Sequence, residues 1–302
     1  MRKFLYIIFV IIIFNQNFTL AQWIKSSNGL SNLNVFRLTE HKGYLIAGTL
    51  GGGVFISTDM GNTWEIKNNG LSDLNIFSIS SNDQYIFIGT QNKGLFRSSD
   101  LGNSWISEKN ELNNKIVMCL LSDNHNIFAG TYGNGLFFSS DDGSNWVSVH
   151  NNLNDLKVTS LAKDKENIFV GLNNGALFKS SNQGQIWFEI NDKITDRPIT
   201  SVVISGENII YSSEFGGVFL SSDYGNQWVS ITAGISDLRV ESLVVFNQNI
   251  FAGTYSKGIF LSTNFGKNWN QLNNGLQNGP ITSFVIIQDE NFTSVLGGGI
   301  FK

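Results

Sequence analysis

Ser57-Thr58-Asp59-Met60-Gly61-Asn62-Thr63-Trp64 is the stretch that decides the fold, because its pattern returns along the whole chain. The pattern Ser-x-Asp/Asn-x-Gly-x-x-Trp begins again every 41 residues, at Ser98, Ser139, Ser180, Ser221 and Ser262. The seven tryptophans keep this spacing without an insertion or deletion, at Trp23, Trp64, Trp105, Trp146, Trp187, Trp228 and Trp269. A repeat of this length lies in the range of propeller blades built from four strands.

Each repeat contains four short strand-like runs separated by Gly, Asn, Asp and Ser. In the first repeat we expect strands A to D, in chain order, at 35–39, 44–49, 53–57 and 64–67. The last repeat supplies only A, B and C, at 281–287, 291–296 and 299–302. Residues 22–25 read as a strand D with nothing before it, so the two ends complete one blade and leave no open edge. A linear solenoid, the alternative, would need capping repeats at both ends.

The sequence therefore predicts an all-β fold: a seven-bladed β-propeller of four-stranded antiparallel blades. Its last blade is closed by the N-terminal strand D and the C-terminal strands A–C. A single propeller domain is expected to span residues 22–302.

The repeated turn has a local physical explanation. Ser and Asp side chains accept hydrogen bonds from backbone N–H groups in a tight turn, and Gly61 can adopt a positive φ at little cost. The Trp that follows can bury its ring beside the neighbouring blade. Asn182 and Asn264 replace the Asp in two repeats, and an amide keeps the acceptor but loses the charge. This pattern indicates turn-forming residues rather than acids or calcium ligands.

This motif resembles the Asp box of the bacterial neuraminidase repeat propellers. That superfamily includes sialidases, xyloglucanase-type glycosidases, sortilin-type receptors and photosystem II assembly-factor propellers. The resemblance covers residues 22–302. In the number of blades and the shortness of the loops, this chain is more similar to the assembly-factor and sortilin-like propellers than to true sialidases. The resemblance implies that the boxes lie at the periphery, and that the D–A and B–C loops share the face where ligands bind.

The first 21 residues read as an export signal. Arg2 and Lys3 precede an apolar run from Phe4 to Phe14, and Ala21 offers a small-residue cleavage site. The run is shorter than the ~20 residues that a membrane span needs. We therefore expect a secreted or periplasmic protein, cleaved after Ala21, with no membrane span after signal removal.

Composition excludes several function classes. The formal net charge is −4, which does not suit a nucleic-acid-binding surface. One Cys, Cys119, allows neither an intrachain disulfide nor a multi-thiolate metal site, and the three His residues fall in different phases of the repeat. No metal, no cofactor and a monomeric state are expected.

The candidate ligand-binding residues gather in the fifth and sixth repeats, where charged residues of the D–A loops neighbour aromatic residues of the B–C loops. Aromatic surface with polar neighbours suits a sugar ring or a peptide, whereas a solvated, mutually paired rim is the plainer alternative. Arg37 joins this group because small residues fill its column in the other repeats; it would bind an anion or pair with Glu241. The candidates are Arg37, Asp196, Arg197, Glu214, Phe215, Arg239, Glu241 and Tyr255.

Two functions follow from this pattern. The first is a non-catalytic exported propeller that binds a protein, peptide or glycan on the face of the D–A and B–C loops. The alternative is a sialidase-like or xyloglucanase-like glycoside hydrolase with Glu214 and Glu241 as its two carboxyls. No feature of the sequence makes these two residues a catalytic pair, and the short B–C loops leave no insertion that could wall a deep cleft.

Overall fold

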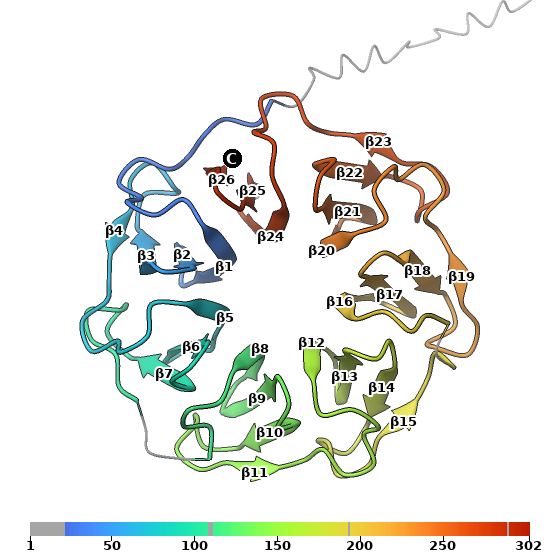
Figure 1. Ribbon diagram of the computed structural model, residues 1–302, viewed down its shortest axis with the longest axis horizontal. Helices are drawn as coiled ribbons and strands as arrows, with labels where there is room; N and C mark the ends of the chain where they lie inside the picture. The colour runs from blue at the N-terminus through green and yellow to red at the C-terminus, as the bar shows by residue number, and fades with distance from the viewer. Residues whose placement is uncertain (1–21, 108–110, 193, 289) are drawn as a thin grey trace, which may run out of the picture.

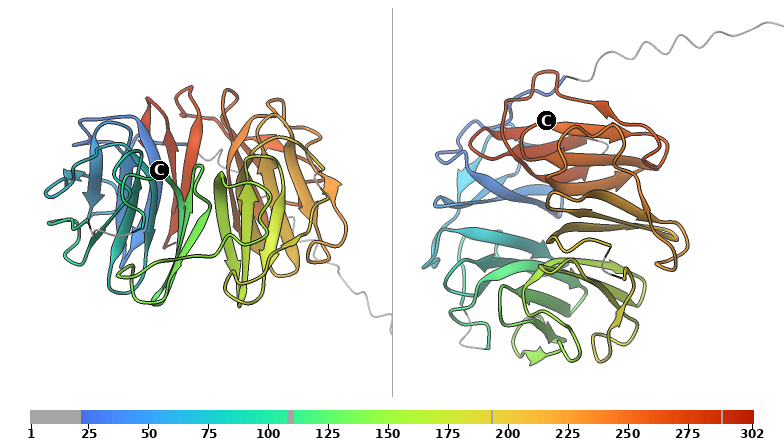
Figure 2. Two further views of the ribbon diagram at one scale, coloured as in Figure 1. Left: turned by 60° about the horizontal axis from the view of Figure 1, so that its bottom comes forward. Right: turned by 45° about the vertical axis from the view of Figure 1, so that its right-hand side comes forward.

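The computed structural model describes residues 22–107, 111–192, 194–288 and 290–302. Seven small antiparallel sheets stand in a ring around a central channel, which confirms the predicted seven-bladed β-propeller (Figure 1). Figure 2 shows the ring from two sides, with the loops gathered at its two faces. The described residues contain no helix that could span a membrane. The predicted signal peptide, residues 1–21, lies outside them.

The first strand of each blade lines the channel. These inner strands combine buried residues with partly exposed ones, because one side packs into the blade and the other faces the channel. They are β1 (Val35–His41), β5 (Ile76–Ser81), β8 (Val117–Asp123), β12 (Val158–Asp164), β16 (Ile199–Ser205), β20 (Val240–Phe246) and β24 (Ile281–Ile287).

The second and third strands form the core of each blade, and nearly all their residues are buried. The second strands are β2 (Tyr44–Thr49), β6 (Ile86–Thr90), β9 (Asn126–Thr131), β13 (Asn167–Leu172), β17 (Asn208–Ser213), β21 (Asn249–Thr254) and β25 (Glu290–Val295). The third strands are β3 (Gly53–Ser57), β7 (Leu95–Ser98), β10 (Leu136–Ser139), β14 (Leu177–Ser180), β18 (Gly217–Ser221), β22 (Ile259–Ser262) and β26 (Gly299–Phe301). Sheets buried on both faces read as continuous apolar runs, as these do.

The outer strands are short. They are β4 (Glu65–Ile66), β11 (Val147–Ser148), β15 (Phe188–Glu189), β19 (Val229–Ser230) and β23 (Asn270–Gln271). Two sheets have three full strands and carry the fourth as a single bridged pair, Arg97 with Ile106 in the second blade and Lys25 with Phe301 in the seventh. Because the outer strands are short, each blade exposes few unpaired backbone groups with which another chain could pair.

The seventh blade joins distant parts of the chain. Ile24 N–H donates to Lys302 O at 2.8 Å, and Lys302 N–H donates to Ile24 O at 2.9 Å. Ser27 Oγ accepts from Ile300 N at 2.9 Å. Asn68 makes the equivalent bond to Val54 N in the first blade, at 2.8 Å. The segment at 24–27 therefore occupies the same place beside β26 that β4 and the residues after it occupy beside β3.

Six of the seven tryptophans join their blade to the one before it, whereas Trp146 Nε1 donates to Gly143 O within its own turn. Trp64 Nε1 donates to Ser26 O at 2.8 Å, and Trp187 Nε1 donates to Val149 O at 2.7 Å. Trp23 Nε1 makes the corresponding bond to Leu272 O at 2.8 Å, across 249 residues of sequence. The rings are largely buried between neighbouring sheets, so each indole contributes both apolar burial and a satisfied donor.

The repeated turn has the predicted hydrogen bonds. Ser57 Oγ accepts from Gly61 N and donates to Asp59 Oδ1, both at 2.8 Å, and Asp59 Oδ1 accepts from Thr63 N at 2.9 Å. Gly61 has a φ of 80°. Asn264 Oδ1 accepts from Asn268 N at 2.9 Å, so the amide accepts the same hydrogen bond as the carboxylate of Asp59.

Deleting residues 22–27 should destabilise the whole ring, because it exposes the edge of β26 and removes the buried Trp23. We expect the free energy of unfolding to fall by more than about 3 kcal/mol, the cost of losing one buried Trp. Denaturant unfolding and light scattering would measure the loss and the accompanying aggregation. A variant with the same unfolding midpoint as the wild type would contradict the closed ring.

Two substitutions of Asp59 distinguish the contribution of its hydrogen-bond acceptor from that of its negative charge. Asp59→Ala should cost about 1 kcal/mol, since Thr63 N loses its partner, whereas Asp59→Asn should stay close to wild type at neutral pH. The hydrogen bonds from Thr63 hold the pKa of Asp59 below its usual range. This stabilisation is present above the ordinary Asp pKa and is lost as the pH falls through the lowered one. Thermal unfolding of both variants across acidic pH would show the wild type, but not Asp59→Asn, losing this contribution.

Candidate functional site

A β-bulge near the start of every inner strand shapes the channel wall. The pairing of β1 with β2 shifts between Val35 and Arg37, and the other inner strands shift at the equivalent place. The extra residue brings two successive side chains of a strand toward the channel. Thr159 with Ser160 and Glu241 with Ser242 are such pairs, and all four line the same cavity.

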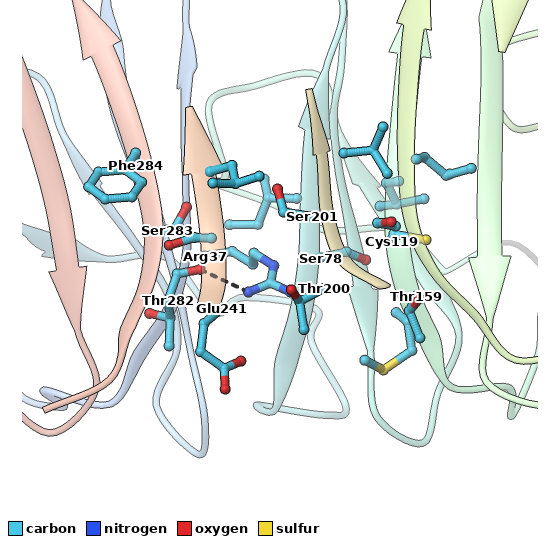
Figure 3. A pocket seen from close by; sticks show the side chains of 18 residues that line it. Arg37, Ser78, Cys119, Thr159, Thr200, Ser201, Glu241, Thr282, Ser283 and Phe284 are labelled. Atoms are coloured by element: carbon cyan, nitrogen blue, oxygen red, sulfur yellow. Dashed lines mark hydrogen bonds between the residues drawn. The ribbon is translucent and has the colours of Figure 1, made fainter. Parts of the chain in front are cut away.

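The channel contains a cavity of about 210 Å³, which continues into one of about 120 Å³ at the mouth. Pro198, which precedes β16, lies on the smaller cavity and places it at the D–A loop end. Six residues line both cavities: Arg37, Met118, Thr159, Thr200, Glu241 and Thr282. Figure 3 shows most of them projecting into the space between the inner strands.

Hydroxyl groups of the wall join neighbouring inner strands. Each donates to the carbonyl at the start of the next inner strand, which fixes the side chain against the channel wall. The bonds are Ser78 Oγ to Val117 O (2.9 Å), Thr159 Oγ1 to Ile199 O (2.7 Å), Thr200 Oγ1 to Val240 O (2.5 Å), Ser242 Oγ to Ile281 O (2.7 Å) and Thr282 Oγ1 to Val35 O (2.9 Å). The first blade carries Phe36 and Arg37 at these two positions and makes no such hydroxyl bond.

Arg37 turns back toward the seventh blade. Its Nη1 donates to Phe36 O at 3.0 Å and to Thr282 O at 3.2 Å, and its guanidinium lies 4.1 Å from the centre of the Phe36 ring (Figure 3). No carboxylate of the described residues lies within salt-bridge distance of it. Burial lowers the pKa of Arg37, and the negative charge of Glu241 acts in the opposite direction. The hypothesis that Arg37 forms a direct ion pair with Glu241 is therefore wrong.

Glu241 instead pairs with Arg239. Arg239 Nε lies 2.7 Å from Glu241 Oε1 and 3.4 Å from Glu214 Oε1. The same guanidinium lies 3.9 Å from the ring centre of Tyr255 and 5.6 Å from that of Phe215. We call these five residues the Arg239 cluster. Burial raises the pKa of Glu241, although the attraction of Arg239 opposes the shift.

Backbone hydrogen bonds place the D–A and B–C loops on one face. Tyr255 N donates to Arg239 O at 2.9 Å, and Glu214 N donates to Pro198 O at 2.9 Å. Asp237 Oδ2 accepts from Ser256 N at 2.7 Å. The Arg239 cluster therefore rests on loops that are fixed to one another, and we call the surface that they form the loop face.

Asp196 and Arg197 form a separate pair on an exposed loop. Arg197 Nε lies 3.4 Å from Asp196 Oδ1, with side-chain exposures of 58% and 92%. No hydrogen bond or ion pair in the described part of the chain connects them to the Arg239 cluster. A pair this exposed adds little to stability, so both side chains remain available to a ligand.

Exposed apolar side chains extend the loop face beyond the cluster. Phe215 and Tyr255 are 56% and 43% exposed. Further exposed residues of the D–A and B–C loops are Leu74, Tyr132, Leu156 and Leu238. Aromatic and leucine side chains spread over one face are typical of surfaces that bind other proteins.

The sequence did not single out the threonines of the channel or Met118. The residue before Arg37 in each repeat was the missed signal, since that column holds Thr159, Thr200, Glu241 and Thr282. Cys119 stands in the wall, where burial raises the pKa of its thiol to about 12, as expected of an unreactive cysteine. No group of three or more metal-ligating side chains occurs in the described ranges.

Arg239→Ala should leave two partly buried carboxylates facing each other. We expect the free energy of unfolding to fall by about 1–3 kcal/mol at neutral pH. The loss should be smaller at acidic pH, below the raised pKa of Glu241, because a protonated Glu241 no longer repels Glu214. Urea unfolding at neutral and at acidic pH would measure it, with Lys267→Ala as an exposed control. A loss that does not depend on pH would contradict the shared role of Arg239.

No family model matches the sequence, and no curated protein matches it. The extracellular domain of BT4673 from B. thetaiotaomicron has a TM-score of 0.77 at 16% identity, over 93% of this chain and 40% of that one. The GH74 xyloglucanase from Xanthomonas campestris has a TM-score of 0.75 at 15% identity, over 92% and 53%. YCF48 bound to D1 peptide has a TM-score of 0.73 at 13% identity, over 91% and 94%. This chain spans less than two thirds of the first two, and all three are similar to it in fold.

Proposed function

We propose that this chain is an exported, non-catalytic propeller that binds an extended segment of a partner protein on its loop face. The observation that carries the proposal is the Arg239 cluster. A guanidinium held between Phe215 and Tyr255 offers a firm aromatic surface beside a polar channel mouth. Aromatic and Arg side chains of this kind dominate the energy of protein interfaces.

A peptide fits the loop face better than a glycan. A sugar ring stacks on one aromatic face and needs free polar groups for its hydroxyls, whereas Glu214 and Glu241 are already paired with Arg239. Leu74, Leu156 and Leu238 would serve apolar side chains of a peptide but offer nothing to a sugar. YCF48, which has the same fold, has been solved with a D1 peptide bound, and this supports a peptide ligand for the present chain.

The proposal includes three further expectations. Residues 1–21 act as a signal peptide that is cleaved after Ala21, and the mature protein is a monomer in the periplasm or outside the cell. The chain belongs to the Asp-box propellers, which the hydrogen bonds of Ser57 and Asp59 support. Arg37, Asp196, Arg197 and the Arg239 cluster form its binding surface.

The glycoside hydrolase remains the second candidate, because burial raises the pKa of Glu241 as a general acid requires. However, Glu214 and Glu241 both bind the same Nε of Arg239, whereas glycosidase carboxyls flank the substrate from two sides. A screen of chromogenic glycosides tests this candidate. Turnover that is lost in Glu214→Gln or Glu241→Gln would favour the hydrolase over the binding protein.

Peptide binding can be tested with peptides selected from a displayed random library on the mature protein. Phe215→Ala and Tyr255→Ala should each weaken the selected peptides by about tenfold or more, as loss of an interface anchor does. Fluorescence anisotropy would measure the affinities. Phe188→Ala is the matched control, since Phe188 is 65% exposed on the outer strand β15. Equal affinity for wild type and both loop-face variants, or selection of no peptide at all, would contradict the proposal.

A further inference from the structure

The channel wall carries a cation that no carboxylate of the described residues contacts directly. Arg37 uses only Nη1, on the carbonyls of Phe36 and Thr282. The donors on Nε and Nη2 have no hydrogen-bond partner in the part of the chain that the structure describes. Glu241, the other charged residue lining the cavity of about 210 Å³, is held by Arg239 instead. Arg37 is only partly buried, and guanidinium donors that face a confined polar cavity favour an anion there.

A second, independent feature lies in the same cavity. Ser160 is 7% exposed, and its Oγ has no hydrogen-bond partner. The reason is its neighbour: Thr159 Oγ1 already donates to Ile199 O, the carbonyl that a serine hydroxyl takes in the second and sixth blades. A buried hydroxyl without a partner is rare and calls for a ligand or a water.

The surroundings define what the cavity would accept. Ser and Thr residues supply polar contacts, while Met118 and Phe36 supply an apolar wall toward the mouth. The free donors of one guanidinium suit one negatively charged group, and a planar guanidinium pairs with a carboxylate through two parallel N–H groups. A cavity of about 210 Å³ holds only a small molecule or the end of a larger one.

We propose that the channel is a binding site for a single carboxylate group with a short apolar substituent, held by Arg37 and reached by the hydroxyl of Ser160. The group would enter from the loop face through the cavity of about 120 Å³, where Phe36 and Met118 contact the substituent. Its source is either a free small monocarboxylate or the C-terminus of a peptide. Only the second source rests on the proposed function.

Calorimetric titration of the mature protein with sodium butyrate tests the site, at constant ionic strength and with chloride as the competing salt. We expect saturable binding that is more than tenfold weaker in Arg37→Gln. The control Lys267→Gln removes an equal charge from an exposed turn and should bind butyrate as the wild type does. Absence of saturable butyrate binding, or binding of equal strength in Arg37→Gln, would overturn the proposal.

Two further measurements distinguish a carboxylate site from a loss of folding and from nonspecific attraction of anions. Ser160→Ala removes only an oxygen without a partner, so the variant should unfold like the wild type while binding butyrate several-fold more weakly. Sulfate should not displace butyrate at equal concentration. Displacement by sulfate would show a general anion site, and unchanged butyrate affinity in both variants would leave no carboxylate site in the channel.

The source of the carboxylate is decided with the peptides selected on the loop face, each prepared as a free acid and as a C-terminal amide. Loss of affinity in the amide together with competition by butyrate assigns the site to a peptide C-terminus. Equal affinity of acid and amide, with no competition, assigns it to a free monocarboxylate. Butyrate binding does not depend on any peptide, so failure of the proposed function would leave this test of the channel intact.

Discussion

Every blade buries the two faces of its sheet against its two neighbours, so the fold depends on contacts that cross from one repeat to another. The indole of Trp64 shows the principle, because its ring packs between two sheets while its N–H reaches the carbonyl of Ser26 in the preceding repeat. The threonines and serines of the channel do the same at the inner end. Thr282 completes the series by donating to Val35. A single repeat could not exist alone, since nothing would cover either face of its sheet.

The regular spacing of Trp made the architecture predictable, and it also placed the second and third strands of the first repeat at their observed bounds. The other two strands differed for local reasons. The inner strand β1 continues to His41, because its pairing with β2 runs to the tight turn at Lys42 and Gly43. The outer strand β4 is shorter than expected, because Trp64 N–H bonds to Asn28 O instead of joining the ladder.

The binding residues were predictable only in part. Charged and aromatic residues in adjacent loops indicated the Arg239 cluster, because the repeat brings equivalent loops together. Which acid binds which base depends on side-chain directions that the repeat does not set. Glu241 binds Arg239, while Arg37 turns back to Thr282. Asp196 and Arg197 are neighbours in the chain, and their pairing on an exposed loop keeps them apart from the cluster.

The ring closes inside one sheet, the seventh blade, and not between two sheets. Lys25 and Phe301 meet there through a single bridged pair, while Trp23 and Ser27 anchor the same strand from either side. A pull on this strand along its length would load all of these bonds at once. A pull across it would break them one after another. The mechanical resistance of the ring therefore depends on the direction in which force is applied to the strand at residues 23–27.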